Sequence, residues 1–327
     1  MTQGASPDYL SRPRPFSEFA VRIAPPDLTP WRSGNIGLPG FIQRRSMRPG
    51  PHVAILSLMH GNEFSGAIVL DALLRAGIEP LCGTLTLGFV NLPAFDSFDP
   101  NTPTSSRFVD EDLNRLWDNE TLNSRRTSLE LIRARQLMPL FETVDVLLDL
   151  HSMLWPSEPL ILAGPSERGM QMARALPVPA LVVADHGHAE GRRLIDHPRF
   201  VEPGGTARAN LLEAGQHWQP ETVTLAAQVV RALLEQTGMI ASSTAPRVSV
   251  TPRQITTVTH TIAAATGQFA FVAPYHGGEI IPRRNTLIAL DGTSEIRTPY
   301  DNCLLVMPSL RASRGHTAVR LAQIEAA

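Results

Sequence analysis

The chain between Pro51 and about Thr237 alternates short apolar runs with longer segments of helical period. The apolar runs have four to seven residues and little polar interruption, which predicts strands buried on both faces. The expected strands are Val53–Met59, Thr84–Val90, Val144–Leu150, Leu160–Ala163, Ala180–Ala184 and Ala209–Glu213. The expected helices are Glu63–Ala76, Ser128–Phe141, Glu167–Leu176 and Thr222–Glu235. This alternation predicts an α/β fold with a mixed, mainly parallel sheet flanked by helices.

The segments on either side of this region have different patterns. Residues 1–50 are rich in Pro, Gly and Arg, which predicts an irregular N-terminal arm with one hairpin near Ile36–Arg45. From Ile255 onward, short β-like runs alternate with turn residues, as in a small all-β domain. We therefore expect an arm at 1–50, a main domain at 51–240, and a small β domain at 241–327 that caps a cleft of the main domain.

Composition narrows the class of protein. The 327 residues are 43% hydrophobic, enough for a large core, and the net charge of -2 gives no basis for binding nucleic acid or an anionic membrane. No window approaches the roughly 20 apolar residues of a membrane span. Cys82 and Cys303 fit no metal or redox spacing, and the first residues lack an apolar signal-peptide core, so we expect a reduced, cytoplasmic protein. The chain has no lysine, which excludes lysine-based catalysis.

Side chains that bind metals follow two of the expected strands. His60 and Glu63 lie three residues apart where the strand Val53–Met59 passes into a helix, and His151 follows the run Val144–Leu150. In such sheets, ligands bind beyond the carboxyl ends of the strands. Two imidazoles and one carboxylate with an open fourth position are typical of a hydrolytic zinc ion. Taken alone, this pair is more typical of a turn histidine and a helix-start carboxylate, which the helix dipole favours, than of a metal site.

Two further motifs carry chemistry that suits such an ion. The polar loop 105–115 contains Arg107, Asn114 and Arg115. By itself this pattern is typical of a solvated loop with salt bridges, but beside a metal an arginine can polarise a carbonyl and an Asn-Arg pair can bind a carboxylate. Glu213 closes an apolar strand, where it is either an ordinary carboxylate in solvent or a general base.

Other polar residues are secondary candidates. Asp149 shares a strand face with His151 but need not contact it. The loop 185–188 contains two histidines and is more typical of a pocket rim than of a metal site. His188 and Arg192–Arg193 are candidates to line the cleft, and His217 is a candidate to support the site near Glu213.

The motifs HGNE (60–63), RFVDEDLNR (107–115), DLHS (149–152) and LLEAGQ (211–216) resemble, in this order, those of the succinylglutamate desuccinylase and aspartoacylase family of the zinc-carboxypeptidase clan. The resemblance covers about residues 50–220, with a further likeness in the C-terminal β region. It implies a zinc-carboxypeptidase-like fold and one Zn²⁺ per chain. The site residues that it implies are His60, Glu63 and His151 as zinc ligands, Arg107 to polarise the carbonyl, Asn114 and Arg115 to bind a substrate carboxylate, and Glu213 as catalytic base and acid.

Two positions depart from the pattern of aspartoacylase-like members. These use a C-terminal tyrosine in substrate binding, but residues 311–317 contain none, which leaves Arg314 and His316 as candidates. They also have an arginine upstream of the catalytic glutamate, and Arg208 lies upstream of Glu213 at a different spacing. The chain is therefore more similar to uncharacterised bacterial members and to N-acetyl-diaminobutyrate deacetylase-like proteins.

We therefore expect a zinc-dependent amidohydrolase that cleaves a C–N amide bond and removes the acyl group of an N-acyl amino acid. The alternatives are a zinc carboxypeptidase acting on short or modified peptides and, in another class, a non-catalytic small-molecule binding protein. The expected partner is a small N-acyl amino acid, with no nucleic acid and no membrane. The motifs leave open the acyl group, the amino acid, zinc against another divalent ion, and whether the chain forms a homo-oligomer.

Overall fold

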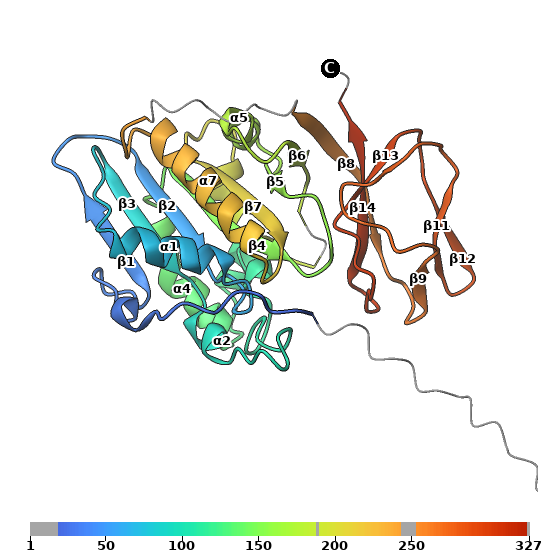
Figure 1. Ribbon diagram of the computed structural model, residues 1–327, viewed down its shortest axis with the longest axis horizontal. Coiled ribbons are helices and arrows are strands. Elements are labelled where there is room, and N and C mark those ends of the chain that lie inside the picture. Colours follow the sequence, from blue (N-terminus) through green and yellow to red (C-terminus); the bar gives the residue numbers. More distant parts are fainter. Residues whose placement is uncertain (1–18, 188–189, 243–252, 326–327) are drawn as a thin grey trace, which may run out of the picture.

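The computed structural model describes residues 19–187, 190–242 and 253–325. An eleven-stranded sheet runs through the molecule (Figure 1). In order across the sheet, the strands are β1 (Phe41–Arg45), β3 (Thr84–Phe89), β2 (His52–Ser57), β4 (Val146–Met153), β7 (Arg208–Gln216), β5 (Leu160–Leu162), β6 (Leu181–Ala184), β8 (Gln254–Ala263), β14 (Thr317–Ile324), β13 (Cys303–Val306) and β10 (Ile280–Ile281). The strands β3, β2, β4 and β7 are mutually parallel. The predicted mixed, mainly parallel α/β sheet is therefore confirmed.

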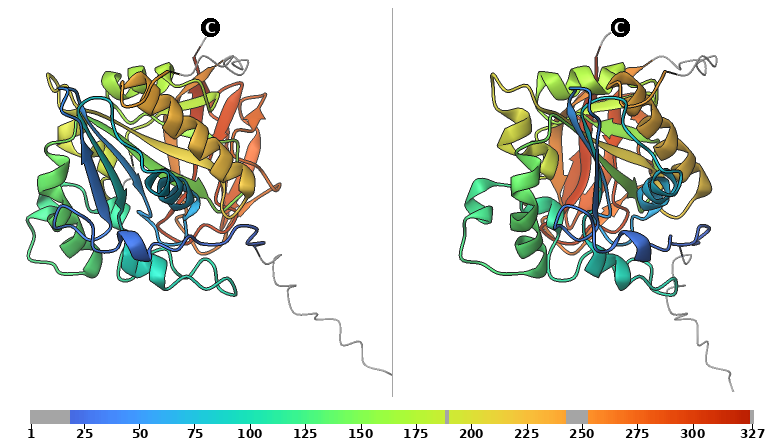
Figure 2. Two further views of the ribbon diagram at one scale, coloured as in Figure 1. Left: turned by 60° about the vertical axis from the view of Figure 1, so that its left-hand side comes forward. Right: turned by 90° about the vertical axis from the view of Figure 1, so that its left-hand side faces the viewer.

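Helices cover both faces of this sheet (Figure 2). In β2, Val53 and Ile55 pack into one hydrophobic core, whereas Ala54 and Leu56 pack into the other. Because successive side chains of a strand point to opposite faces, a strand buried on both sides must be apolar throughout. The first core is covered by α1 (Ser65–Arg75), α5 (Glu167–Ala175) and α7 (Pro220–Gln236), and the second by α4 (Leu129–Phe141) and α6 (Pro198–Val201).

All six expected strands and all four expected helices are present, with ends displaced by three residues at most. The sequence pattern missed only short helical segments. These are η1 (Thr29–Trp31), α2 (Leu92–Asp96), η2 (Leu113–Arg115), α3 (Asn119–Leu122), η3 (Leu194–Asp196) and α6. Segments of three to five residues are too short to show a helical period. Among the described residues, no helix is long and apolar enough to cross a lipid bilayer.

The expectation of an irregular arm with a local hairpin was wrong for residues 41–45. This segment forms β1, the edge strand of the main sheet, and pairs antiparallel with β3. The Phe41 ring packs over Gly88, where an added Cβ would lie 2.5 Å from the ring. The paired residues are 39 to 47 positions apart, from Arg45–Thr84 to Phe41–Gly88, and no local sequence pattern marks a pairing at this distance. Residues 1–18 lie outside the described part of the chain.

The C-terminal region is all-β, as predicted, but its strands continue the main sheet. β8 pairs in parallel with β6, and β14 and β13 follow in antiparallel order. The strands β9 (Phe269–Phe271), β11 (Leu287–Asp291) and β12 (Ser294–Arg297) form a separate three-stranded sheet. A small core that includes Ile288, Leu305 and Val319 lies in this region. The sheet thus joins the C-terminal strands to the main body through β8.

Candidate metal centre and active site

The ends of three neighbouring parallel strands bring the main candidate residues together. His60 follows β2, while His151 lies near the end of β4 and Glu213 lies in β7. β4 lies between the other two strands, and His151 and Glu213 are direct partners in the β4–β7 register. The topology therefore unites residues that are about 150 positions apart in the sequence.

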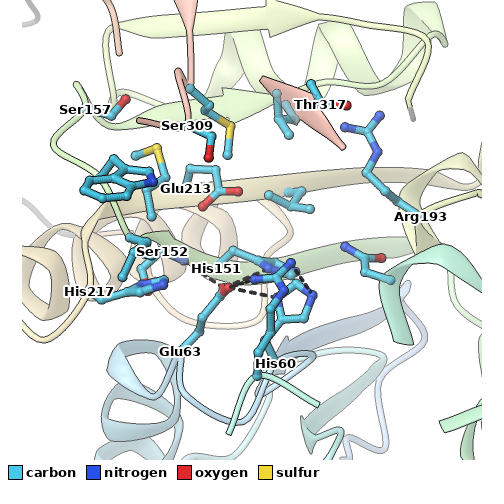
Figure 3. A pocket seen from close by; sticks show the side chains of 18 of the residues that line it. His60, Glu63, His151, Ser152, Ser157, Arg193, Glu213, His217, Ser309 and Thr317 are labelled. Atoms are coloured by element: carbon cyan, nitrogen blue, oxygen red, sulfur yellow. Dashed lines mark hydrogen bonds and ion pairs between the residues drawn. The ribbon is translucent and has the colours of Figure 1, made fainter. Parts of the chain in front are cut away.

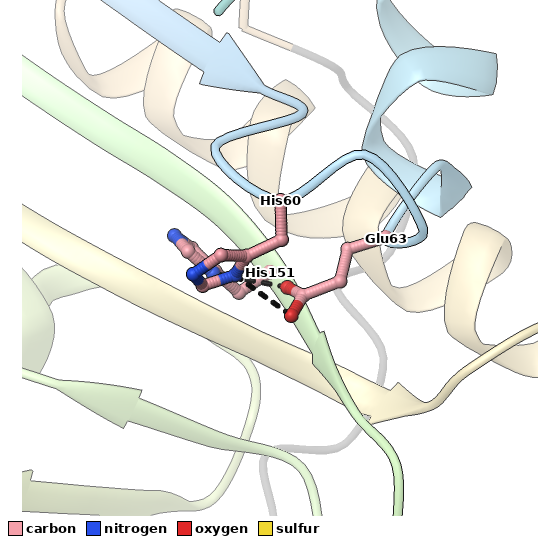
Figure 4. A group of neighbouring side chains, drawn as sticks. All are labelled: His60, Glu63 and His151. Atoms are coloured by element: carbon pink, nitrogen blue, oxygen red, sulfur yellow. Dashed lines mark hydrogen bonds and ion pairs between the residues drawn. The ribbon is translucent and has the colours of Figure 1, made fainter. Parts of the chain in front are cut away.

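His60, Glu63 and His151 form one buried group (Figure 4). The Glu63 carboxylate lies between the two rings, with Oε1 2.8 Å from His60 Nδ1 and Oε2 3.0 Å from His151 Nδ1. One candidate ligand atom from each residue lies within 4.8 Å of the others. Ligands of a tetrahedral zinc ion lie about 3.4 Å apart, since each bond is about 2.0–2.1 Å. The donor set and its spacing therefore fit a zinc ion.

The outer nitrogens of both histidines face carboxylates, which is a second feature of metal-binding histidines. His60 Nε2 lies 3.0 Å from Asp112 Oδ1, and His151 Nε2 lies 2.9 Å from Asp149 Oδ2. Such carboxylates fix the ring orientation and leave the other nitrogen free to bind a metal. Both Nδ1 atoms face Glu63, so both histidines present the same ring nitrogen to the centre.

The surroundings of this group favour a negatively charged Glu63 and a positively charged His151. Burial acts to raise the pKa of Glu63, but His60 and His151 hold that pKa well below its ordinary value. Burial acts to lower the pKa of His151, but Asp149 and Glu63 hold it well above the ordinary range. Each of these buried charges is therefore stabilised by its neighbours.

The HGNE loop packs tightly against the loop that carries Arg107. An added Cβ at Gly61 would lie 2.3 Å from the backbone carbon of Ala94 and 2.5 Å from the carbonyl oxygen of Ser106, so only glycine fits. The Gly61 amide also donates to the Arg107 carbonyl at 3.1 Å. The glycine of the motif therefore fixes one polar loop against the other.

Arg107 reaches the metal centre with its guanidinium. Nη1 donates to Glu63 Oε1 at 3.0 Å, and Nη2 donates to Asp112 Oδ2 at 3.1 Å. Nη2 also lies 3.0 Å from His60 Nε2. The side chain is 37% exposed and lines the adjoining pocket.

Glu213 is a buried carboxyl group with a free oxygen. It is 6% exposed, and its Oε2 atom has no hydrogen-bond partner within the described part of the chain. Burial raises the pKa of Glu213 to about 8, and the negative charge of Glu63 adds to this effect. A divalent cation beside it would favour the ionised form. An unpaired carboxyl group is costly to bury, and it is suited to exchange a proton with a bound molecule.

Asn114 and Arg115 lie on the pocket wall, as η2 directs them. Asn114 Oδ1 accepts a hydrogen bond from the Leu194 amide at 3.0 Å, so the side-chain amide is held in one orientation. Arg115 Nη1 donates to the Asn114 carbonyl at 2.8 Å, and its nearest carboxylates, on Asp112 and Glu190, lie 3.8 and 3.9 Å away. These loose ion pairs leave donors available for a second carboxylate.

These groups share one pocket of about 270 Å³ (Figure 3). It includes all three candidate ligands together with Arg107, Asn114, Arg115 and Glu213. The C-terminal region contributes to the pocket wall through Met307–Ser309 and the start of β14. The sequence motifs therefore meet in a single small cavity.

Two predicted substrate-binding residues lie elsewhere. Arg208 begins β7, five residues before Glu213, which corresponds to about 17 Å along a strand at ~3.3 Å per residue. It lines a different groove, between α5 and α7. Arg314 is exposed and is not among the pocket residues, whereas His316 and Thr317 are. The structure therefore does not bring Arg208 or Arg314 into the pocket that holds the other candidate residues.

Several pocket residues were secondary candidates or were missed. Arg193 and Arg320 are buried and line the pocket, and Arg320 had no sequence signal because it is one polar residue in a C-terminal strand. His217 Nδ1 lies 2.7 Å from Ser152 Oγ, and the Ser152 amide donates to Glu63 Oε2 at 3.1 Å. His217 is thus linked to the candidate metal ligand Glu63 through Ser152. His188 lies outside the described residues.

Residues 49–235 match the Succinylglutamate desuccinylase/Aspartoacylase catalytic domain. The chain belongs to this family. Its segments are 32% identical over 118 residues to aspartoacylase of Xenopus tropicalis, and 35% identical over 109 residues to a probable aspartoacylase of Nostoc sp.. These segments cover 33% and 31% of this chain and 36% and 34% of the two relatives, so the chain spans about a third of the length of the curated relatives that it matches.

Solved structures of the family have the same fold. Succinylglutamate desuccinylase from Vibrio cholerae superimposes with a TM-score of 0.68 at 18% identity, over 88% of this chain and 86% of that one. A succinylglutamate desuccinylase/aspartoacylase from Rhodobacter sphaeroides gives 0.62 at 17% identity, over 88% of each chain. At this identity the likeness concerns the fold, which includes the C-terminal β region.

Proposed function

We propose that this protein is a zinc-dependent amidohydrolase that removes the acyl group from a small N-acyl amino acid. The proposal rests on Glu213, a buried carboxyl group that shares one pocket with the His60–Glu63–His151 group. Its Oε2 atom makes no hydrogen bond within the described residues. Membership of a family that contains deacylases supports the type of reaction. One zinc ion per chain would be held by His60, Glu63 and His151.

When bound, zinc supplies a Lewis acid for the amide carbonyl and lowers the pKa of a water molecule. Arg107 donates to the carbonyl oxygen and stabilises the negative charge that develops on it. Glu213 takes a proton from the attacking water and then delivers it to the leaving amine nitrogen. Asn114 and Arg115 bind the carboxylate of the amino-acid half and orient the amide.

The size of the pocket favours a small substrate over a peptide. A volume of about 270 Å³ lies just below the usual range of about 300–1,000 Å³ for small-molecule pockets. Residues Met307–Ser309 form part of the pocket wall, which leaves little room for a longer peptide. The proposed partner is therefore a single N-acyl amino acid.

The test is hydrolysis of N-acyl amino acids by the zinc-loaded protein, measured beside dipeptides. We expect release of free amino acid from N-acyl compounds, and activity on dipeptides alone would support a carboxypeptidase instead. Glu213→Gln should lower kcat by about 10²–10⁴-fold while zinc content is unchanged. Normal turnover by this variant would refute the assigned base, and a protein that binds N-acyl compounds without cleaving them would be a binding protein.

A further inference from the structure

The pocket has two ends of different chemistry. One end carries Arg115, Glu190, Arg193 and Arg320. The other end is formed by the chain that leaves β4, residues 153–157, and by the loop after β13, residues 307–309. In Figure 3, Arg193 and Thr317 lie above and to the right of the His60–Glu63–His151 group, whereas Ser157 and Ser309 lie above and to the left of it.

The second end is apolar. It is lined by Met153, Leu154, Trp155, Pro156, Met307 and Pro308, together with two serines, and His217 lies on the same side of the pocket (Figure 3). Neither segment contains a charged residue. The Ser157 hydroxyl donates to the Glu158 carbonyl at 3.0 Å, so its proton is already used within the chain. We call this surface the apolar end.

At the charged end, Arg193 is held in close ion pairs within the chain, whereas the ion pairs of Arg115 are loose. Arg193 makes close contacts to two carboxylates, 2.7 Å to Asp185 Oδ1 and 2.7 Å to Asp196 Oδ2. Arg320 Nε lies 3.8 Å from Asp185 Oδ2. Arg193 is therefore a fixed wall of the pocket, and Arg115 with its loose ion pairs is the group that suits the carboxylate of an incoming amino acid.

This inference rests on the proposed function. If Asn114 and Arg115 bind the amino-acid carboxylate and Arg107 contacts the scissile carbonyl, the acyl group extends away from Arg115, toward the apolar end. A carboxylate on that acyl group would lose its hydration among methionine, leucine and tryptophan side chains without gaining a cation there. Added methylene groups would instead be buried, and each is worth about fourfold in binding.

We propose that the substrate carries an uncharged, apolar acyl group larger than acetyl, of the alkanoyl or aroyl class, and not a dicarboxylic acyl group such as succinyl. Trp155 and Met307 are the residues that select it. Both reach the pocket from loops beyond strand ends. Trp155 offers a large flat apolar ring, and the flexible Met307 thioether adapts to the shape of the group beside it.

The test uses a matched pair of acyl groups on the same series of amino acids. In 4-methylpentanoyl an isopropyl group stands where succinyl has its carboxylate, so the two have nearly the same shape. The zinc-loaded protein should hydrolyse the 4-methylpentanoyl compound with a kcat/KM on the order of 100-fold above that of the succinyl compound. The acetyl compound should fall between them. Equal or faster cleavage of the succinyl compound would overturn the inference.

A variant of the apolar end gives an independent measurement. Met307→Arg supplies a cation and should shift the succinyl to 4-methylpentanoyl ratio of kcat/KM at least tenfold toward succinyl. Met47→Arg is the matched control, because Met47 is fully exposed, and it should leave the ratio unchanged. If Met307→Arg does not fold, Trp155→Ala should lower kcat/KM for 4-methylpentanoyl and benzoyl compounds about tenfold but not for acetyl. An unchanged ratio in the folded variants would assign the acyl group to another surface.

Failure of the proposed function has a different signature. In that case no N-acyl compound is cleaved by the zinc-loaded protein. Calorimetry with zinc-loaded Glu213→Gln then still measures how tightly each compound binds. Tighter binding of the 4-methylpentanoyl compound than of the succinyl compound supports the apolar end as the acyl site. Equal or weaker binding refutes it.

Discussion

His151 Nε2 and Asp149 Oδ2 lie 2.9 Å apart, although the two residues are neighbours on one strand face and nothing in their spacing requires contact. Asp149 is fully buried, and its carboxylate orients the ring so that Nδ1 faces Glu63. We predict that Asp149→Asn lowers zinc affinity about 10–100-fold, because the amide cannot hold the imidazole in the same tautomer with the same charge. Competition with a chromophoric chelator measures this. Asp99→Asn, at an exposed loop, is the control, and equal zinc affinity of both variants would contradict the role of Asp149.

The Glu130 side chain anchors the loop that carries Arg107 and Asp112. It is 1% exposed, and its oxygens accept hydrogen bonds from the amides of Val109 at 2.7 Å and Asp110 at 3.0 Å, and from Asn91 Nδ2 at 3.0 Å. In Glu130→Gln the amide nitrogen faces backbone donors, so at least one donor loses its partner. Hydrogen bonds to charged groups contribute about 1.5–3 kcal/mol each.

We therefore predict that Glu130→Gln lowers the free energy of unfolding by about 2 kcal/mol and also lowers kcat. Urea unfolding and steady-state kinetics measure the two effects. Glu120→Gln, at an exposed helix start, should change neither. A loss of stability without any change in kcat would mean that the loop keeps Arg107 in place by other contacts.

Asn114 offers a test of carboxylate binding that leaves the fold intact. Its Oδ1 accepts from the Leu194 amide at 3.0 Å, so an aspartate can keep that hydrogen bond. Asn114→Asp, however, replaces the amide donor with a negative charge beside Arg115. We predict that KM for N-acyl amino acids rises at least about tenfold through like-charge repulsion, with little change in thermal stability. Asn123→Asp, on the exposed surface, is the matched control, and an unchanged KM in Asn114→Asp would remove Asn114 from the substrate site.

The sequence predicts most of the fold and the centre of the site for a simple reason. Strands such as His52–Ser57 are buried on both faces and therefore show as unbroken apolar runs, and the chemistry follows directly at their ends. His60, Glu63 and His151 could be found because each stands next to such a run. Their contacts with Asp112 and Asp149 could not, because side-chain rotamers decide them.

What the sequence did not reveal depends on pairings between distant segments. β1 joins β3 and β8 joins β6, although no local pattern marks either pairing. Arg320 reaches the pocket from β14 only because the C-terminal strands continue the sheet. Arg208 was expected in the site because it precedes Glu213 in the sequence. A strand rises by about 3.3 Å per residue, however, so Arg208 lies at the far end of the same strand, away from the site.

The buried pair of Asp185 and Arg193 predicts how stability depends on acid. Burial acts to raise the pKa of the Asp185 carboxyl, but Arg193 overrides this effect and holds that pKa below its ordinary value. Since the folded pKa lies below the unfolded value of about 3.9, this carboxylate adds stability above about pH 4, and the stability is lost as pH falls further. We predict a free energy of unfolding that changes little from pH 8 to 5 through this group and falls steeply below pH 4.

The variant Asp185→Asn isolates this contribution. It leaves the buried Arg193 with Asp196 as its remaining close carboxylate and should cost about 3–5 kcal/mol at pH 7, as expected when one partner of a buried pair is removed. Because the ionisable group is gone, its free energy of unfolding should fall less between pH 4 and 3 than that of the unmodified protein. Urea unfolding across this pH range measures both effects. Parallel curves for the two proteins would show that other carboxylates, not Asp185, set the acid sensitivity.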